Sequence, residues 1–140
     1  MKLEKAIFAC GCFWGAQYQF EHAKGVVRST VGYIGGHKEH PAYEEVKAHT
    51  TGHAEATLVE FDAEQTSFTE LCKLFFEIHD PAQTDGQGPD IGPQYRSEIF
   101  YLNDKQKEEA EAVIALLRRK GYEVNTKLTS ATTFWEGEEY

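Results

Sequence analysis

Cys12 is the residue of this chain best placed for chemistry. It follows Gly11, at the point where a short apolar run ends and a helical pattern begins. Free backbone N–H groups and the positive end of the dipole at a helix start stabilise an anion, so a thiolate is favoured there. Phe13 and Trp14 come next and could wall an apolar pocket for a small group such as a methyl. The alternative is a buried core cysteine beside core aromatic residues.

Strand and helix patterns alternate on both sides of Cys12. Strands are predicted over residues 5–9, 26–34, 54–61, 97–102 and 124–128, and helices over residues 13–21, 67–78 and 104–120. Ser67 and Glu70 are spaced as a capping box, and Asp104 is expected to cap the last helix. Two segments, 35–52 and 82–94, are rich in glycine and proline and are predicted as long loops, which are often functional.

This order of elements contains the split βαβ unit of ferredoxin-like folds. We therefore expect an α+β protein, a two-layer sandwich with a mainly antiparallel sheet, helices packed on it and long active-site loops. A chain of 140 residues is about one domain long. Residues 1–140 are accordingly predicted to form a single catalytic domain.

Composition excludes several classes of partner. The net charge of −9 with no basic stripe argues against nucleic-acid binding, which needs Lys and Arg to neutralise phosphates. The apolar run at the N-terminus is soon broken by glycine, so no signal peptide or membrane span is predicted. We expect a cytoplasmic monomer. Three cysteines are an odd number, which is atypical of a disulfide framework.

Two other classes of function use the same cysteine. One is a Cys–His hydrolase or acyl transferase, although no Asn or Asp stands at a recognisable spacing to orient a histidine. The other is a metal-binding or redox-sensing module built from cysteines 10 and 12 and histidines 37, 40, 49 and 53. That set lacks the paired spacings of a zinc site, so no metal is predicted. A protein that only binds a ligand at this site, without catalysis, is a further alternative.

The run Gly11-Cys12-Phe13-Trp14-Gly15 resembles the signature of the A-type peptide methionine sulfoxide reductases. Four further segments match this family in the same order: residues 43–46, 51–55, 79–83 and 94–97. Together the five segments span most of the chain. The resemblance implies that Cys12 attacks the sulfoxide sulfur as a nucleophile. It also implies that Phe13 and Trp14 hold the methyl group of methionine sulfoxide.

The resemblance implies polar roles as well. Glu55 would protonate the sulfoxide oxygen, which leaves poorly until it is protonated. Tyr43 and Tyr95 would donate hydrogen bonds to that oxygen and stabilise its developing charge. Asp90 would belong to the polar side of the site. Taken by themselves, the acid at 55 could be exposed, the two tyrosines half-buried with wet hydroxyls, and Asp90 a turn residue.

The product form of Cys12 would be a sulfenic acid, which a second thiol must reduce. Many family members carry recycling cysteines in a C-terminal tail, whereas no cysteine follows Cys72 here. Cys72 lies on the apolar stripe of its predicted helix, and a bridge from Cys10 to Cys12 would be strained. We therefore expect no cofactor and an external reductant: glutathione, glutaredoxin or a small dithiol, with thioredoxin as the competing partner. The resemblance implies the S epimer, free or in proteins, as substrate.

Overall fold

The computed structural model describes residues 2–11, 13–36, 52–83, 86–87 and 90–137. In these ranges the helices are α1 (Phe13–Glu21), α3 (Phe68–Glu77) and α4 (Asp104–Arg119), with a 3-10 turn η1 (Pro93–Tyr95). The strands are β1 (Leu3–Cys10), β2 (Val26–Ile34), β3 (Ala54–Asp62), β4 (Gly86–Gln87), β5 (Asp90–Ile91), β6 (Ser97–Tyr101), β7 (Lys127–Ser130) and β8 (Trp135–Glu136). None of the helices in this part of the chain is long and apolar enough to cross a membrane.

Within the described ranges, six of the strands form a mixed sheet in the order β7-β6-β1-β3-β2-β8. β1 pairs antiparallel with both β3 and β6, β2 pairs antiparallel with β3 and β8, and β6 pairs parallel with β7. The remaining two strands, β4 and β5, form a separate short hairpin. The architecture is α+β, as predicted.

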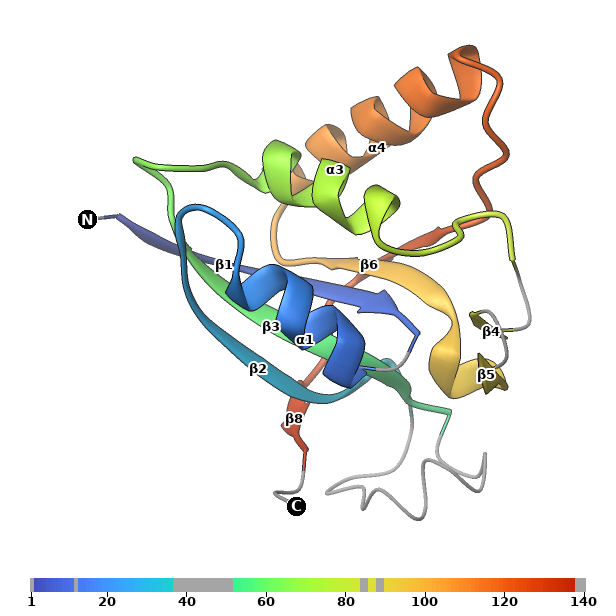
Figure 1. Ribbon diagram of the computed structural model, residues 1–140, viewed down its shortest axis with the longest axis horizontal. Helices are drawn as coiled ribbons and strands as arrows, with labels where there is room; N and C mark the ends of the chain where they lie inside the picture. Colours follow the sequence, from blue (N-terminus) through green and yellow to red (C-terminus); the bar gives the residue numbers. More distant parts are fainter. Residues whose placement is uncertain (1, 12, 37–51, 84–85, 88–89, 138–140) are drawn as a thin grey trace.

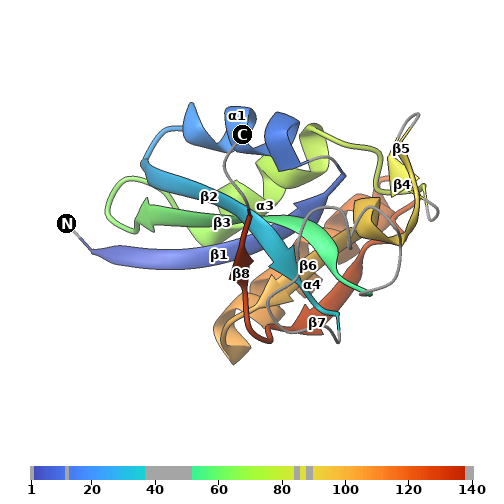
Figure 2. The ribbon, with the colours of Figure 1, turned by 90° about the horizontal axis from the view of Figure 1, so that it is seen from below.

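Alternation along β1 divides the core between the two faces of this sheet. Ala6 and Phe8 face a core cluster to which α1, α3 and α4 contribute. Ile7 and Ala9 face a second cluster, which is packed by residues of the C-terminal segment before β8, Phe134 among them. The helices therefore cover one face, and the chain returns across the other to reach the edge at β2 (Figures 1 and 2).

Local signals placed most of these elements, and four details of the prediction were wrong. The cap of α4 is Asn103, whose side chain accepts from the Gln106 N–H at 2.9 Å, and Asp104 is the first helical residue. The last long strand spans Lys127–Ser130 instead of residues 124–128. The predicted loop 82–94 contains β4, β5 and η1, and β8 was not predicted. These short strands depend on distant partners for their hydrogen bonds, so a local pattern does not mark them.

Candidate active site

The predicted strand–turn–helix around Cys12 is confirmed. β1 ends at Cys10, α1 begins at Phe13, and Gly11 between them has a φ of +99°. Glycine is the residue that adopts such a backbone without steric cost, so the turn requires it. Cys12 itself and the side chains of Phe13 and Trp14 lie outside the described part of the structure.

Gly11 lies directly against the side chain of Gln87. A Cβ added to Gly11 would stand 2.8 Å from Cβ of Gln87 and 2.9 Å from its Cγ, distances too short for any residue but glycine. The hairpin of β4 and β5 therefore passes beside the turn that leads to Cys12. Asp90 begins β5 opposite Gln87, so its backbone belongs to the same hairpin, while its side chain lies outside the described part.

Glu55 is a buried acid near the start of β3. Its side chain is 1% exposed, so the alternative of an exposed acid is wrong. By alternation it shares a face of β3 with Val59 and Phe61, which belong to the core cluster under the helices. Tyr33 of β2, also fully buried, is its partner in the strand register. Glu55 thus belongs to the face of the sheet on which α1 packs.

The strand register brings Glu55 beside the end of β1. β1 and β3 are antiparallel, and Phe8 pairs with Thr57. Two residues onward on β1 stands Cys10, and two residues back on β3 stands Glu55. The acid therefore lies at the end of the sheet towards which β1 runs, and the chain continues from that end of β1 to Cys12.

Tyr95 lies in η1, which packs against both β3 and β4. Its side chain is half-buried, and its N–H donates to the Gly92 carbonyl at 3.1 Å. The structure therefore brings the backbone segments of Tyr95, Asp90 and Glu55 to the same end of the sheet. Tyr43 lies outside the described residues.

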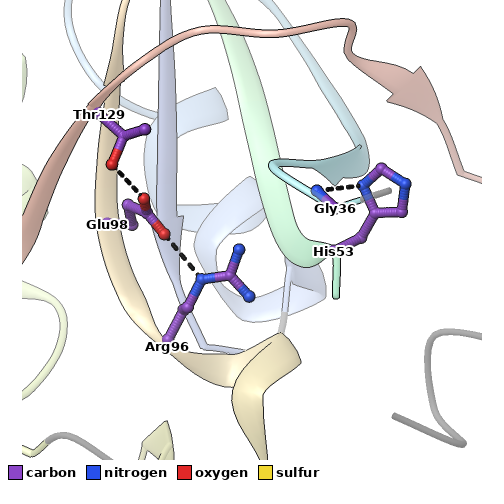
Figure 3. Close-up of polar contacts among 5 residues, drawn as sticks. All are labelled: Gly36, His53, Arg96, Glu98 and Thr129. Carbon is purple, nitrogen blue, oxygen red and sulfur yellow. Dashed lines mark hydrogen bonds and ion pairs between the residues drawn. The ribbon is translucent and has the colours of Figure 1, made fainter. Parts of the chain in front are cut away.

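His53 fastens the ends of β2 and β3 together. Its side chain is 3% exposed, and its Nδ1 accepts the Gly36 N–H at 3.0 Å (Figure 3). An accepting Nδ1 carries no proton, so a neutral His53 ring holds its proton on Nε2. His53 therefore has a structural role as a hydrogen-bond acceptor between the two strand ends.

Arg96 and Glu98 form a nearly buried ion pair that was not predicted. Arg96 Nε lies 2.7 Å from Glu98 Oε1, and Thr129 of β7 donates a hydrogen bond to the other carboxylate oxygen. Figure 3 shows the guanidinium directed from β6 towards the ends of β2 and β3, where its Nη2 lies close to Gly35. The available signal was a pair of opposite charges two residues apart, at the start of the predicted strand 97–102.

His79, just after α3, links two of the matched segments. Its Nδ1 contacts the Phe75 carbonyl at 2.5 Å, and its Nε2 contacts Ser97 Oγ at 2.7 Å. A carbonyl only accepts, so Nδ1 carries the proton and Ser97 donates to Nε2. Thr126 Oγ1 lies 2.7 Å from Ser97 Oγ and completes the chain of hydrogen bonds. Burial is the main reason that the pKa of His79 falls from 6.5 to about 4.

This depressed pKa predicts a fall in stability on mild acidification. As pH drops from 6.5 towards 4, unfolded His79 takes up a proton and folded His79 does not, so the unfolded state is favoured. The contribution to the slope of unfolding free energy is at most about 1.4 kcal/mol per pH unit. Urea unfolding across this window should show a shallower slope for His79→Gln than for wild type. The exposed His22, replaced in the same way, is the control and should leave the slope unchanged; equal slopes for all three proteins would contradict the assignment.

Two of the three cysteines are buried. Cys72 belongs to the core cluster under the helices, and burial raises the pKa of its thiol. Burial also raises the pKa of Cys10 to about 12. Both remain protonated thiols at neutral pH and are poor nucleophiles. Among the residues that the structure describes, no three His, Cys, Asp or Glu side chains are grouped to hold a metal ion.

Comparison with known proteins agrees with this geometry. The family model "Peptide methionine sulfoxide reductase" matches residues 4–140. The chain is 46% identical to peptide methionine sulfoxide reductase MsrA of Geobacter sulfurreducens, over 99% of this chain and 87% of that protein. It is 48% identical to MsrA of Methanosarcina mazei, over 99% of this chain and 67% of that protein.

Solved structures show the same relationship. Mxr1 of Saccharomyces cerevisiae in reduced form matches with a TM-score of 0.90 at 33% identity, over 99% of this chain and 82% of Mxr1. Methionine sulfoxide reductase A of Corynebacterium diphtheriae matches with a TM-score of 0.85 at 32% identity, over 97% of this chain and 70% of that one. The chain therefore belongs to the A-type peptide methionine sulfoxide reductases, a family of oxidoreductases.

Proposed function

We propose that this protein reduces methionine-S-sulfoxide, free or in proteins, to methionine by attack of the Cys12 thiolate on the sulfoxide sulfur. The observation that carries the proposal is the buried Glu55, which lies at the end of the sheet where β1 leads to Cys12. Sulfoxide reduction needs a thiolate and an acid together, since one group attacks sulfur and the other protonates oxygen, and the sequence position of Cys12 and the burial of Glu55 fit these two roles.

The reaction balances with one cysteine and one proton. The methionine sulfur gains two electrons and loses its oxygen, the Cys12 sulfur loses two electrons, and the oxygen ends as a sulfenic acid on Cys12. Glu55 supplies the proton to the sulfoxide oxygen as the sulfur–oxygen bond breaks. Tyr43 and Tyr95 donate hydrogen bonds to that oxygen.

The remaining site residues orient the substrate. Phe13 and Trp14, at the start of α1, hold the methyl group, and Asp90 lies on the polar side. Exchanging methyl and oxygen would bury the oxygen against aromatic rings at the cost of its hydrogen bonds, which accounts for a choice of the S epimer. The position of Asp90 on a hairpin that passes beside Gly11 supports this arrangement.

An external thiol returns Cys12 to its reduced form. The burial of Cys10 and Cys72 and their raised pKa values support this step, because neither thiol is ready to attack a sulfenic acid. Yeast Mxr1 has been solved in complex with Trx2, which supports a thioredoxin as one such reductant. Glutaredoxin and glutathione are the other candidates. No cofactor takes part.

We further propose that residues 1–140 form one catalytic domain with a ferredoxin-like core and a mainly antiparallel sheet. The strand order β6-β1-β3-β2, with α1 and α3 as the crossing helices, supports that description. The domain acts as a monomer in the cytoplasm.

Anaerobic turnover of the two resolved epimers tests the proposed function. With dithiothreitol as reductant, we expect the S epimer of methionine sulfoxide to be reduced and the R epimer to react at least about tenfold more slowly, because its oxygen would meet the aromatic wall. Without reductant, one methionine should form per protein, together with a dimedone-trapped sulfenic acid on the Cys12 peptide. No turnover of either epimer, or equal rates for both, would contradict the proposal.

A further inference from the structure

The side-chain amide of Gln87 makes two hydrogen bonds to the backbone of Asp80. Its Oε1 accepts the Asp80 N–H at 2.7 Å, and its Nε2 donates to the Asp80 carbonyl at 2.7 Å. These two hydrogen bonds attach the hairpin of β4 and β5 to Asp80, which lies just beyond α3. Neither the motifs nor the predicted roles single out Gln87.

The segment that Gln87 grips is itself firmly held. The Asp80 carboxylate accepts the Ala82 N–H at 2.9 Å, and the Pro81 carbonyl accepts the Asn125 N–H at 2.7 Å. His79, next to Asp80, is bonded to Ser97 of β6. Gln87 is therefore anchored to a part of the chain that is tied both to the sheet and to the segment before β7.

The aliphatic part of Gln87 lies on Gly11. Its Cβ and Cγ occupy the space where a side chain at position 11 would stand. These contacts form a closed ring. Cys10 pairs with Ser97, and Ser97 is hydrogen-bonded to His79. Asp80, the next residue, is hydrogen-bonded to Gln87, which contacts Gly11 beside Cys10. The ring closes on the residue directly before Cys12.

The same side chain also fixes the position of Asp90. Gln87 and Asp90 are partners in the hairpin register, so a shift of one moves the other. The turn before the nucleophile and the hairpin with the polar site residue are thus held in one arrangement by a single glutamine.

We propose that Gln87 is a positioning residue of the active site, acting through Gly11 on Cys12 and through the hairpin on Asp90. This inference rests on the proposed function for its catalytic consequence. Without its hydrogen bonds to Asp80, the Gln87 side chain no longer fixes the position of the hairpin. The turn at Gly11 then loses its packing contact with Gln87. Misplacement of a reacting group by about 1 Å lowers rates by roughly 10²-fold.

Gln87→Leu is the direct test, and Gln106→Leu is its matched control. Gln106 is also a glutamine that binds two backbone groups: it accepts the Leu102 N–H at 2.9 Å and donates to the Lys5 carbonyl at 2.7 Å. It therefore clamps the opposite end of β1. We expect Gln87→Leu to lower kcat for methionine-S-sulfoxide at least about tenfold with a small change in Tm, whereas Gln106→Leu lowers Tm and leaves kcat within about twofold of wild type.

Alkylation of Cys12 by iodoacetamide gives a second readout that does not require turnover. Its rate is followed against pH on the Cys12 peptide, with Cys12→Ser as the blank. If the turn supports the thiolate, the midpoint in Gln87→Leu moves to higher pH by about one unit, while that of Gln106→Leu stays at the wild-type value. This measurement stands even if wild type fails to reduce the sulfoxide, in which case the proposed function alone is overturned.

Gln87→Glu separates the hydrogen bonds from the packing on Gly11. It keeps the aliphatic part, and its neutral carboxyl can both accept from and donate to Asp80, whereas its ionised form only accepts. The ratio of its kcat to that of wild type should therefore rise as pH falls. A ratio that is independent of pH, wild-type behaviour of Gln87→Leu in both assays, or equal losses in Gln87→Leu and Gln106→Leu would each overturn the inference.

Discussion

Replacement of Cys12 by serine is expected to lower turnover of methionine-S-sulfoxide at least about 10³-fold, the scale of losing a nucleophile. A serine hydroxyl stays protonated where a cysteine at a helix start is favoured as a thiolate. A serine also cannot form a sulfenic acid, which is the product that an external thiol reduces. The measurement is methionine formed per protein under anaerobic conditions, first without reductant and then with dithiothreitol.

Cys10→Ala and Cys72→Ala are the matched controls for this loss. Both cysteines are buried and protonated, so each variant should retain turnover with dithiothreitol at temperatures well below its Tm. If both variants also retain turnover with thioredoxin as reductant, neither Cys10 nor Cys72 is the thiol that reduces the sulfenic acid. Loss in either variant would make that cysteine a recycling partner. Full activity of Cys12→Ser would refute the assignment of the nucleophile.

Replacement of Glu55 by glutamine is expected to slow sulfenic acid formation about 10²- to 10⁴-fold, the range associated with a general acid. Glutamine retains the size of the side chain and its capacity for hydrogen bonds, but it has no proton to transfer. Single turnover without reductant is the right measurement, because a slow reduction step would otherwise conceal the change. The rate should also lose its dependence on the protonation of this residue.

Glu60→Gln is the control on the same strand. Glu60 lies towards the other end of β3, where its register partners are Lys5 and Arg28, and it is only half-buried. The same chemical change there should leave the single-turnover rate within about twofold of wild type, because no reacting group lies near it. Equal rates for Glu55→Gln and wild type would show that another group protonates the sulfoxide oxygen.

Elements whose residues and flanking turns favour them locally were predicted well from the sequence, and elements that depend on distant partners were not. The bounds of β2 are those predicted, because Gly25 and Gly35 flank it and its residue types favour a strand. α1 begins where predicted, after the turn at Gly11. β8 was missed because its two residues pair with Gly32 and Tyr33, about a hundred positions earlier. Val124 and Thr126 are buried as strand residues often are, but the parallel pairing with β6 begins only at Lys127, whose partner is Glu98.

The site shows the same division. The turn and the following helix pattern made Cys12 a candidate nucleophile, with a buried core cysteine as the alternative. The burial of Glu55 could not, because acids are mostly exposed and only the pairing of β3 with β1 and β2 covers this one. Gln87 and His79 have no local signal, since their importance lies in partners that folding brings to them: Asp80 and Gly11 for one, Ser97 for the other.

The sheet order has a consequence for how copies of the protein meet in solution. In the described part of the chain the six-stranded sheet ends in β7, with four residues, and β8, with two. β7 stands beside β6, whose N–H and carbonyl groups would otherwise face outward, and β8 pairs with two of the nine residues of β2. At the β7 edge a neighbouring chain meets a strand of only four residues, which is a short template for edge-to-edge pairing. The shortness of β7 therefore limits growth of this sheet by addition of a strand from another chain.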